Sequence, residues 1–403
     1  MEKTIKKRFL NNSIIVLAGT TLLNFKSLIF LPLIVKTAGI KVYGEYTLLM
    51  LMFFLCQGFL SLGTEFSFKR FIPTAKSKIQ KANLFYRTLY FKLLNMILFS
   101  ILFYFFEKPI NKYIFNNSLS FSYYLIPLFT VCSTLFYMGA DYFRYSGKIE
   151  FNKICSLAYQ YLHIFLIAVL FFYFSFSITL DILVLSLTLL SLLFSLIFYY
   201  RIIKEIGFHF KFFSITKLKY EIKYGFPLVL NFINDYILMS SDRYLIELYL
   251  NIALAGSYHS GYILGSLVLI FPKALRLILT QYFSKSQDSG KLIDQATILN
   301  YCIRWTLILS VPFIFGSYLF SQPILTILTN KTISSSVYKI VPIISLSCVF
   351  FSMNMLFADI LFVKQKTKEI FKMNFYACIF NITSNIILMY FLKSLYVPAF
   401  TTL

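Results

Sequence analysis

The sequence contains few charged residues, and few of those are acidic. Charged side chains make up 13% of the 403 residues, roughly half the share in soluble domains. The chain has only 16 Asp and Glu residues but 38 Lys and Arg residues. Hydrophobic residues reach 59%, and apolar runs recur along the whole chain that are longer than barrel strands of about 10 residues. The composition excludes a soluble domain and predicts an all-α integral membrane protein.

Motifs for catalysis and metal binding are also missing. The chain has no Gly-rich phosphate loop, no HExxH motif and no CxxC pair. Its six cysteines all fall inside apolar runs, where they are expected to act as small buried hydrophobes rather than in disulfides. We therefore expect no enzyme and no cofactor. A membrane-embedded glycosyltransferase or polymerase is a weaker alternative, because it would need a sizeable outward loop with catalytic residues.

Eleven apolar stretches are long enough to cross a bilayer as helices. They are residues 13–36, 45–66, 84–106, 122–143, 155–175, 178–200, 221–245, 254–282, 295–320, 336–362 and 371–392. A final segment, 394–403, is too short to cross. The prediction is eleven complete transmembrane helices and a truncated twelfth, and whether that truncation is natural is left open.

The basic residues are distributed unevenly over the predicted loops. The N-terminus and every second loop after it carry 24 of the 38, the other loops carry 8, and 6 lie inside spans. Because cytoplasmic loops are enriched in Lys and Arg, this bias predicts a cytoplasmic N-terminus. It also accounts for most of the net charge of +22, so nucleic-acid binding is not needed.

Three segments of the first half recur in the second half at a nearly constant offset. The segment "GIKVYGEY" (39–46) resembles "NIALAGSY" (251–258), and "FYFFEKPINKYIFN" (103–116) resembles "SYLFSQPILTILTN" (317–330). The third pair is "SYYLIP" (122–127) and "VYKIVP" (337–342). The order and spacing predict two parallel six-helix pseudo-repeats around a central cavity, with lobes at 1–205 and 206–403.

Charged residues inside the predicted spans are the strongest candidates for function. A charge at the middle of a bilayer costs about 2.5–3.5 kcal/mol on insertion scales, so such side chains should face protein or water. Arg87 is expected to reach the cytoplasmic surface. The remaining basic residues form the predicted cationic, substrate-binding cavity: Lys26, Lys92, Lys273, Arg276 and Arg304. For Lys26, a structural pair with an acid on a neighbouring helix is the alternative.

The stretch 221–245 places several polar residues at helical spacing. Asn231, Asn234, Asp235 and Asp242 are related by steps of three, four and seven residues, which predicts a shared helix face. Asp235 and Asp242 are candidates for coupling transport to H⁺ or Na⁺. Asn374, Asn381 and Asn385 form a second stripe, expected to pack between helices.

Several motifs together resemble a known family. These are "GIKVYGEYTLL", "LSLGTEFSFKRF", and the segment from "YGFPLVLNFINDYILMSSDRYLI" to "AGSYHSGYIL". They are similar to the Wzx-type polysaccharide-biosynthesis flippases of the multidrug/oligosaccharidyl-lipid/polysaccharide exporter superfamily. The resemblance is most specific at ten residues: Gly39, Tyr43, Gly44, Tyr46, Pro227, Ser241, Asp242, Arg243, Gly256 and Tyr258.

The resemblance implies translocation of an undecaprenyl-pyrophosphate-linked oligosaccharide across a bacterial inner membrane by alternating access, for O-antigen or capsule synthesis. It further implies a polysaccharide polymerase and a chain-length regulator as partners. A cavity lined by basic residues would attract the pyrophosphate. The alternative is a cation-coupled multidrug exporter of the same superfamily, whose cationic substrates such a cavity would repel. For the flippase, Lys26→Ala and Arg276→Ala are expected to abolish surface polysaccharide while leaving the protein in the membrane.

Overall fold

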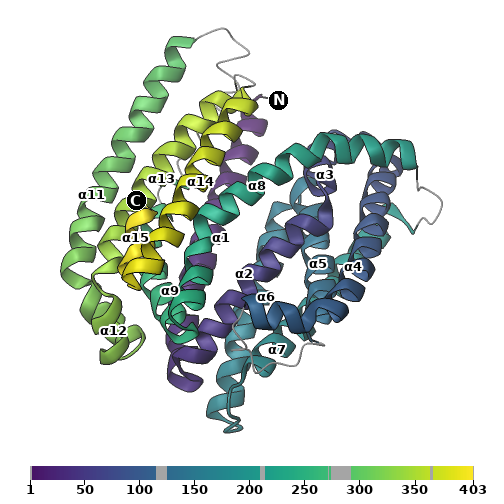
Figure 1. The fold of residues 1–403 in the computed structure, drawn as a ribbon. Helices are drawn as coiled ribbons and strands as arrows, with labels where there is room; N and C mark the ends of the chain where they lie inside the picture. Colours follow the sequence, from purple (N-terminus) through teal and green to yellow (C-terminus); the bar gives the residue numbers. More distant parts are fainter. Residues whose placement is uncertain are drawn as a thin grey trace. The chain divides into compact units, whose positions relative to one another are not determined.

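The computed structural model describes residues 2–114, 125–208, 214–270, 272–273, 292–363 and 366–402, and regular structure in these ranges is helical (Figure 1). The N-terminal helices are α1 (Glu2–Thr37), α2 (Gly39–Ser61), α3 (Thr64–Phe71), α4 (Lys78–Ile114), α5 (Leu125–Tyr145), α6 (Ile149–Phe172) and α7 (Leu180–Ile206). The C-terminal ones are α8 (Ile215–Tyr249), α9 (Ile252–Ser266), the 3₁₀ turn η1 (Leu267–Leu269), α11 (Leu292–Leu328), α12 (Lys331–Val337), α13 (Ile340–Val363), α14 (Thr367–Leu392) and α15 (Tyr396–Thr401). The predicted fold class is confirmed.

Ten of the eleven predicted spans correspond to described helices that are long and apolar enough to cross a membrane. The one predicted span without such a helix is 221–245. It falls within α8, which is 35 residues long but is not among the ten candidate spans. Its apolar pattern is interrupted by Asn231, Asn234, Asp235, Asp242 and Arg243. Of the predicted span 254–282, only the part up to Leu269 forms a candidate span in the described residues.

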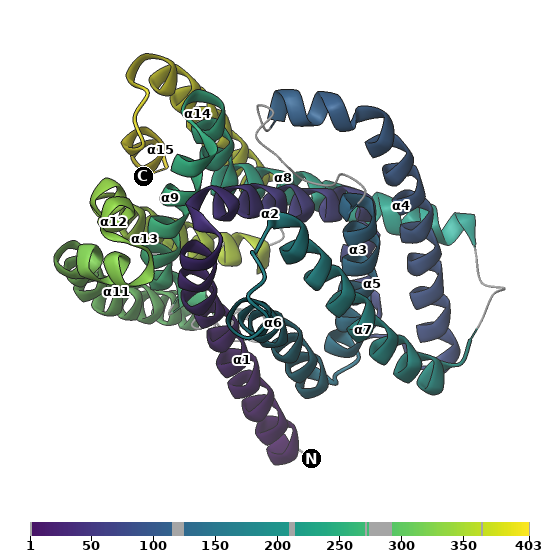
Figure 2. The ribbon, with the colours of Figure 1, turned by 90° about the horizontal axis from the view of Figure 1, so that it is seen from below.

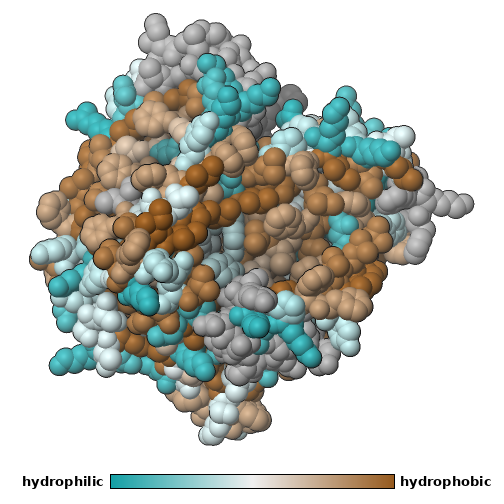
Figure 3. Space-filling model, in the orientation of Figure 1, coloured by the Kyte–Doolittle hydropathy of each residue, from teal (hydrophilic) through white to brown (hydrophobic). Residues whose placement is uncertain are grey.

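Large hydrophobic side chains cover much of the exposed helix surface. Phe105, Phe315 and Phe391 are each about two-thirds exposed or more. In the space-filling view, hydrophobic residues spread along the helices of the face shown, while hydrophilic ones gather near helix ends (Figure 3). A soluble protein rarely exposes such extensive apolar surface, so these faces are suited to lipid.

The chain divides into two compact units. Unit 1 contains residues 1–26 and 45–236, and unit 2 contains residues 27–44 and 237–403. This division differs from the lobes predicted from the repeat, because the first part of α8 packs within unit 1 and the end of α1 within unit 2. One example is Tyr236, whose hydroxyl donates a hydrogen bond to the Leu51 carbonyl, 3.0 Å away.

Helix boundaries support the internal repeat. Helices α4 and α11 are both 37 residues long, and they begin 214 residues apart and end 214 residues apart. Each carries a proline near its C-terminal end, Pro109 and Pro323, which are one of the sequence-matched pairs.

In unit 2, the two copies of the first repeated segment meet at a pair of glycines. A Cβ on Gly44 would lie 2.2 Å from the Ile252 carbonyl oxygen, and a Cβ on Gly256 would lie 2.7 Å from the Ile40 carbonyl oxygen. Ile40 and Ile252 are matched in the repeat, as are Gly44 and Gly256. The contact is therefore reciprocal, as expected around a two-fold axis. Only glycine allows the backbones to approach this closely.

Unit 1 is built around α5, α6 and α7, which pack against one another (Figure 2). Aromatic rings fill their interface: Phe136 lies against Tyr159 on α6 and Phe198 on α7, with ring centroids 4.4 and 5.6 Å apart. Close backbone contact also joins α3 to α8. A Cβ on Gly225 would lie 1.9 Å from the Gly63 carbonyl oxygen, and Gly63 itself has φ of +87°.

Candidate functional site

A polar seam runs between α1 and α6 in unit 1. Lys26 donates a hydrogen bond to the Gln160 side-chain carbonyl, and the Lys153 ammonium donates to the Thr20 hydroxyl, 3.1 Å away. The Tyr161 hydroxyl donates to the Leu22 carbonyl at 2.9 Å. Lys26 and Lys153 thus each donate to a neutral side chain, and they lie within the candidate membrane spans Ala18–Thr37 and Ile149–Phe172, respectively. A seam of this kind concentrates positive charge where an anion could be bound.

Lys92 has a different environment. It lies on α4, is 3% exposed, and its ammonium is 3.6 Å from a carboxylate oxygen of Glu65 on α3. Glu65 also pairs with Lys69 one turn along the same helix. Burial raises the pKa of the Glu65 carboxyl, but the charges of Lys92 and Lys69 outweigh that effect and lower it to about 2. Glu65 is therefore ionised at neutral pH and offsets part of the positive charge of Lys92.

Arg87 is buried rather than extended to the membrane surface, so the expectation of a surface position was wrong. Its side chain forms an ion pair with Glu221 on α8, in which Nε lies 3.1 Å from both carboxylate oxygens. Both side chains are almost fully buried. Residue spacing could not reveal this pair, because 134 residues separate the partners.

In unit 2, residues that carry the family resemblance form one buried network between α8 and α9. The Tyr258 hydroxyl donates to an oxygen of Asp242 at 2.7 Å, and a second Asp242 oxygen lies 3.7 Å from the Arg243 guanidinium. Arg243 also donates from Nε to His259 Nδ1 at 3.2 Å and lies 3.9 Å from the centre of the Tyr262 ring. From the sequence, Arg243 was counted among the eight basic residues of the outer loops. That was wrong, since Arg243 is 2% exposed inside α8.

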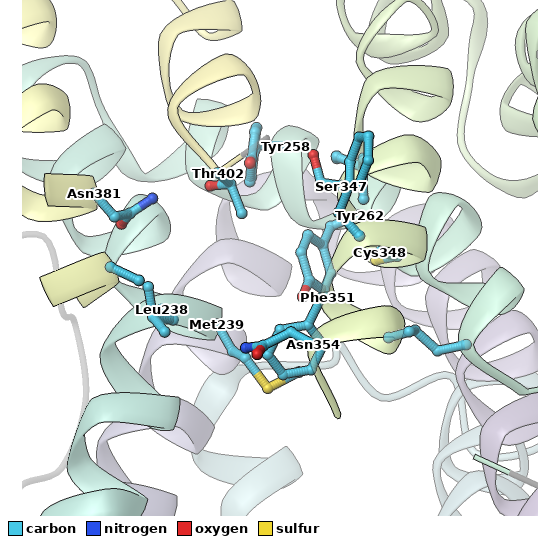
Figure 4. A pocket seen from close by; sticks show the side chains of 14 residues that line it. Leu238, Met239, Tyr258, Tyr262, Ser347, Cys348, Phe351, Asn354, Asn381 and Thr402 are labelled. Carbon is cyan, nitrogen blue, oxygen red and sulfur yellow. The ribbon is translucent and has the colours of Figure 1, made fainter. Parts of the chain in front are cut away.

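A cavity of about 230 Å³ lies beside this network (Figure 4). Its walls come from α8, α9, η1, α13 and α14, with Thr402 after α15, all in unit 2. The lining residues are aromatic, aliphatic or neutral and polar, and those with side-chain hydrogen-bonding groups include Tyr258, Tyr262, Ser347, Asn354, Asn381 and Thr402.

The remaining predicted site residues are not gathered at one place within either unit. Lys273 is exposed and is close enough to Cys348, a lining residue of the cavity, for an electrostatic interaction. Arg304 is exposed on α11, five residues into the candidate span Leu299–Leu328. Arg276 lies outside the described residues. The cationic cavity stays a prediction.

The predicted polar face of α8 separates into two environments. Asn234 and Asp242 are buried, whereas Asp235 is exposed. The predicted shared helix face therefore does not give these residues one common environment. Steps of one residue turn the helix by about 100°, so Asp235 points away from Asn234. The asparagine stripe on α14 packs as expected: Asn381 donates to the Thr401 carbonyl at 3.1 Å, and Asn385 accepts from the Thr401 hydroxyl at 2.6 Å.

Gln160, Glu221 and His259 contact the predicted residues but were not singled out from the sequence. One signal was present for Gln160, which lies three residues before His163 inside an apolar run and so shares its helix face. His163 is fully buried. Glu221 and His259 carry no comparable signal in the sequence.

Comparison with known proteins gives two family matches. The family described as "Polysaccharide biosynthesis protein" matches residues 9–274, and the family described as MatE matches residues 227–387. No curated protein sequence matches this chain.

Solved structures share the fold at low sequence identity. The Lipid II flippase MurJ, in an inward closed conformation, has a TM-score of 0.73 and 18% identity, covering 98% of this chain and 84% of that one. An inward-facing multidrug resistance MATE family transporter of the MOP superfamily has a TM-score of 0.72 and 15% identity, covering 95% and 93%. A MOP superfamily transporter from Pyrococcus furiosus has a TM-score of 0.67 and 12% identity, covering 98% and 92%.

Proposed function

Because the chain belongs to the polysaccharide biosynthesis protein family, within the MOP superfamily of transporters and flippases, we propose that it moves a lipid-linked oligosaccharide across the bacterial inner membrane. The substrate is an undecaprenyl-pyrophosphate-linked repeat unit for O-antigen or capsule synthesis. Transport proceeds by alternating access, and polysaccharide polymerase and a chain-length regulator act on or beside the delivered substrate.

The observation that carries this proposal is the position of Lys26 in the middle of a candidate span, hydrogen-bonded to the neutral Gln160. A protonated lysine at this depth is costly unless protein or water surrounds it. Lys153, in the same seam, adds a second positive charge. Together they favour an anionic group such as a pyrophosphate over a cationic drug.

The proposal is tested in cells that depend on this protein for surface polysaccharide. Lys26→Ala should abolish the polysaccharide, and Lys26→Arg should retain part of it, because arginine keeps the charge. The matched control is Lys36→Ala, at the end of the same helix. Normal polysaccharide in Lys26→Ala cells, with the protein present in the membrane at the normal level, would contradict the assignment.

A second candidate function is cation-coupled multidrug export. It is favoured by the MatE match over residues 227–387, which include most of the lining of the unit 2 cavity. Efflux of an organic cation dye from cells would be lost on deletion of the protein if this function is correct. The flippase proposal expects no change in dye efflux.

Coupling to H⁺ or Na⁺ is part of the proposal, with Asp235 as the acid involved. The Asp235 side chain is exposed, whereas Asp242 is buried and is held by Tyr258 and Arg243. Asp235→Asn should remove the dependence of transport on the ion gradient, and Asp242→Asn should instead lower the amount of folded protein. If the transport rate of the wild type did not depend on either the H⁺ or the Na⁺ gradient, coupling would be excluded.

A further inference from the structure

The cavity in unit 2 differs chemically from the lysine seam in unit 1. Among the described residues that line it, none carries a charge. In the close view, the side chains of Tyr258, Ser347, Asn354 and Thr402 surround a common space together with aromatic rings (Figure 4). The site thus combines neutral hydrogen-bonding groups with apolar ring faces.

Three of the hydroxyl groups that line the cavity already donate hydrogen bonds within the protein. Tyr258 donates to Asp242 at 2.7 Å, Ser347 donates to the Ile343 carbonyl at 2.9 Å, and Thr402 donates to the Pro398 carbonyl at 2.7 Å. Each hydroxyl has one proton, so only its oxygen lone pairs remain for a ligand. The Asn354 amide donates one of its two N–H groups to the Asn374 side-chain oxygen, at 3.4 Å. The cavity therefore offers acceptor oxygens together with amide N–H donors, and it suits a ligand whose hydroxyl groups both donate and accept.

Charges around the cavity argue against an organic cation as that ligand. Asp242 and Arg243 compensate one another beside the lining residue Tyr258. Lys273 interacts electrostatically with Cys348, which lines the cavity. This interaction places a positive charge near the cavity, and Cys348 does not neutralise it. An organic cation would be repelled by Lys273. A neutral ligand with several hydroxyl groups can use the polar lining groups without needing an opposite charge there.

Aromatic rings and size restrict the ligand further. Tyr258, Tyr262, Phe350 and Phe351 supply flat apolar surfaces, against which the C–H faces of a sugar ring can pack. The volume of about 230 Å³ is below the 300–1,000 Å³ typical of sites for drug-sized molecules. It suits one or two rings rather than a whole repeat unit.

We propose that the unit 2 cavity is a sugar-binding subsite that holds a neutral pyranose ring of the transported molecule. This inference rests on the proposed function, because the ring is part of the lipid-linked oligosaccharide. In this proposal the sugar ring is bound by Tyr258, Ser347, Asn354 and Thr402. The pyrophosphate is instead attracted by the basic residues, so the two parts of the substrate are recognised at different sites.

The test places a photo-crosslinking amino acid, p-benzoylphenylalanine, at Phe350. This side chain lines the cavity but is 56% exposed, so a larger group can be accommodated. The same substitution at Phe351 is a second position, and at Phe315 on α11, which does not line the cavity, it is the control. Cells making the lipid-linked oligosaccharide are irradiated, and adducts on the purified protein are identified by mass spectrometry. Transport by each variant is measured in parallel to show that it is folded.

The expected adduct at Phe350 or Phe351 contains a hexose or aminohexose, and the adduct at Phe315 contains only acyl chains. Ser347→Ala in the Phe350 variant should lower the captured sugar about threefold to tenfold, for the loss of one hydrogen bond. If transport occurs and neither cavity position captures sugar, the subsite is wrong while the proposed function stands. If the wild type transports no lipid-linked oligosaccharide, the proposed function fails and this inference fails with it.

Discussion

At the scale of single residues, buried charges in unit 1 are matched by partners far away in the sequence. Arg87 and Glu221 form such a pair at the interface of α4 and α8. Removing one partner of a buried ion pair leaves an uncompensated charge, which typically costs about 3–5 kcal/mol, whereas replacing both with apolar groups is often nearly neutral. This asymmetry separates a structural pair from a substrate-binding arginine.

We predict that Glu221→Leu lowers the thermal stability of the purified protein strongly and that Arg87→Met/Glu221→Leu restores most of the loss. The measurement is the unfolding midpoint in detergent. The matched control is the partly exposed pair Lys148–Glu205, at 2.7 Å, where Glu205→Leu should cost about 1 kcal/mol or less. A double variant as unstable as the single one would show that the pair has another role.

The Glu65 carboxyl gives a prediction for pH. Its pKa is lowered to about 2 from 4.5 by Lys92 and Lys69, which outweigh the effect of burial. A group whose pKa is lowered by folding stabilises the protein above its unfolded-state pKa, and that stabilisation is lost as pH falls towards the folded-state value. The wild type should therefore be more stable than Glu65→Gln at pH 6, and the difference should shrink between pH 4.5 and 2. A difference that is constant over this range would contradict the ionised pair.

Residue-level reasoning from the sequence singled out charged side chains but not their partners. The cost of a charge in a membrane span predicted that Lys26 and Lys92 face protein or water, whereas Arg87 was expected at the surface. It did not identify Gln160 or Glu221 as the groups that accommodate them, because the partners are determined by how the helices pack. Arg243 was misplaced for a related reason: a charge near the end of an apolar run looks the same whether it is buried or in a loop.

At the scale of helices, close packing depends on glycine at a few positions. Gly44 and Gly256 occupy matched places in the repeat and bring α2 and α9 into backbone contact in unit 2. The repeated motif was visible in the sequence because these glycines cannot be replaced without separating the helices. Helix lengths and positions were likewise predictable, because long apolar runs leave few other structures for a chain in lipid.

We predict that Gly256→Val reduces the amount of folded protein in the membrane severely. A side chain there would meet the Ile40 carbonyl oxygen and the Gly44 backbone, none of which can move as a flexible side chain would. The cost should exceed the roughly 1–3 kcal/mol of ordinary overpacking. The control is Gly316→Ala on α11, where the added carbon meets nothing within 4 Å and should stabilise the helix by about 0.5–1 kcal/mol. Equal yields of the two variants, by fluorescence-detected gel filtration, would disprove the close contact.

At the scale of the whole molecule, the distribution of basic residues predicts the orientation. A cysteine in place of Lys76, between α3 and α4, should react only with a reagent that reaches the cytoplasm. A cysteine in place of Lys108, near the end of α4, should react from the outside with a membrane-impermeant maleimide. The wild type measures the background, since its six cysteines are free thiols within helices. The reverse labelling pattern would place the N-terminus outside.

The central claim is that the molecule moves an anionic lipid-linked oligosaccharide rather than an organic cation. It is tested most directly with the purified protein in lipid vesicles, by following the transfer of fluorescent lipid-linked oligosaccharide and, separately, of a fluorescent organic cation. The account predicts transfer of the oligosaccharide that is lost in Lys26→Gln and retained in part in Lys26→Arg, with no transfer of the cation. Transfer of the cation alone, or oligosaccharide transfer unchanged in Lys26→Gln, would contradict it.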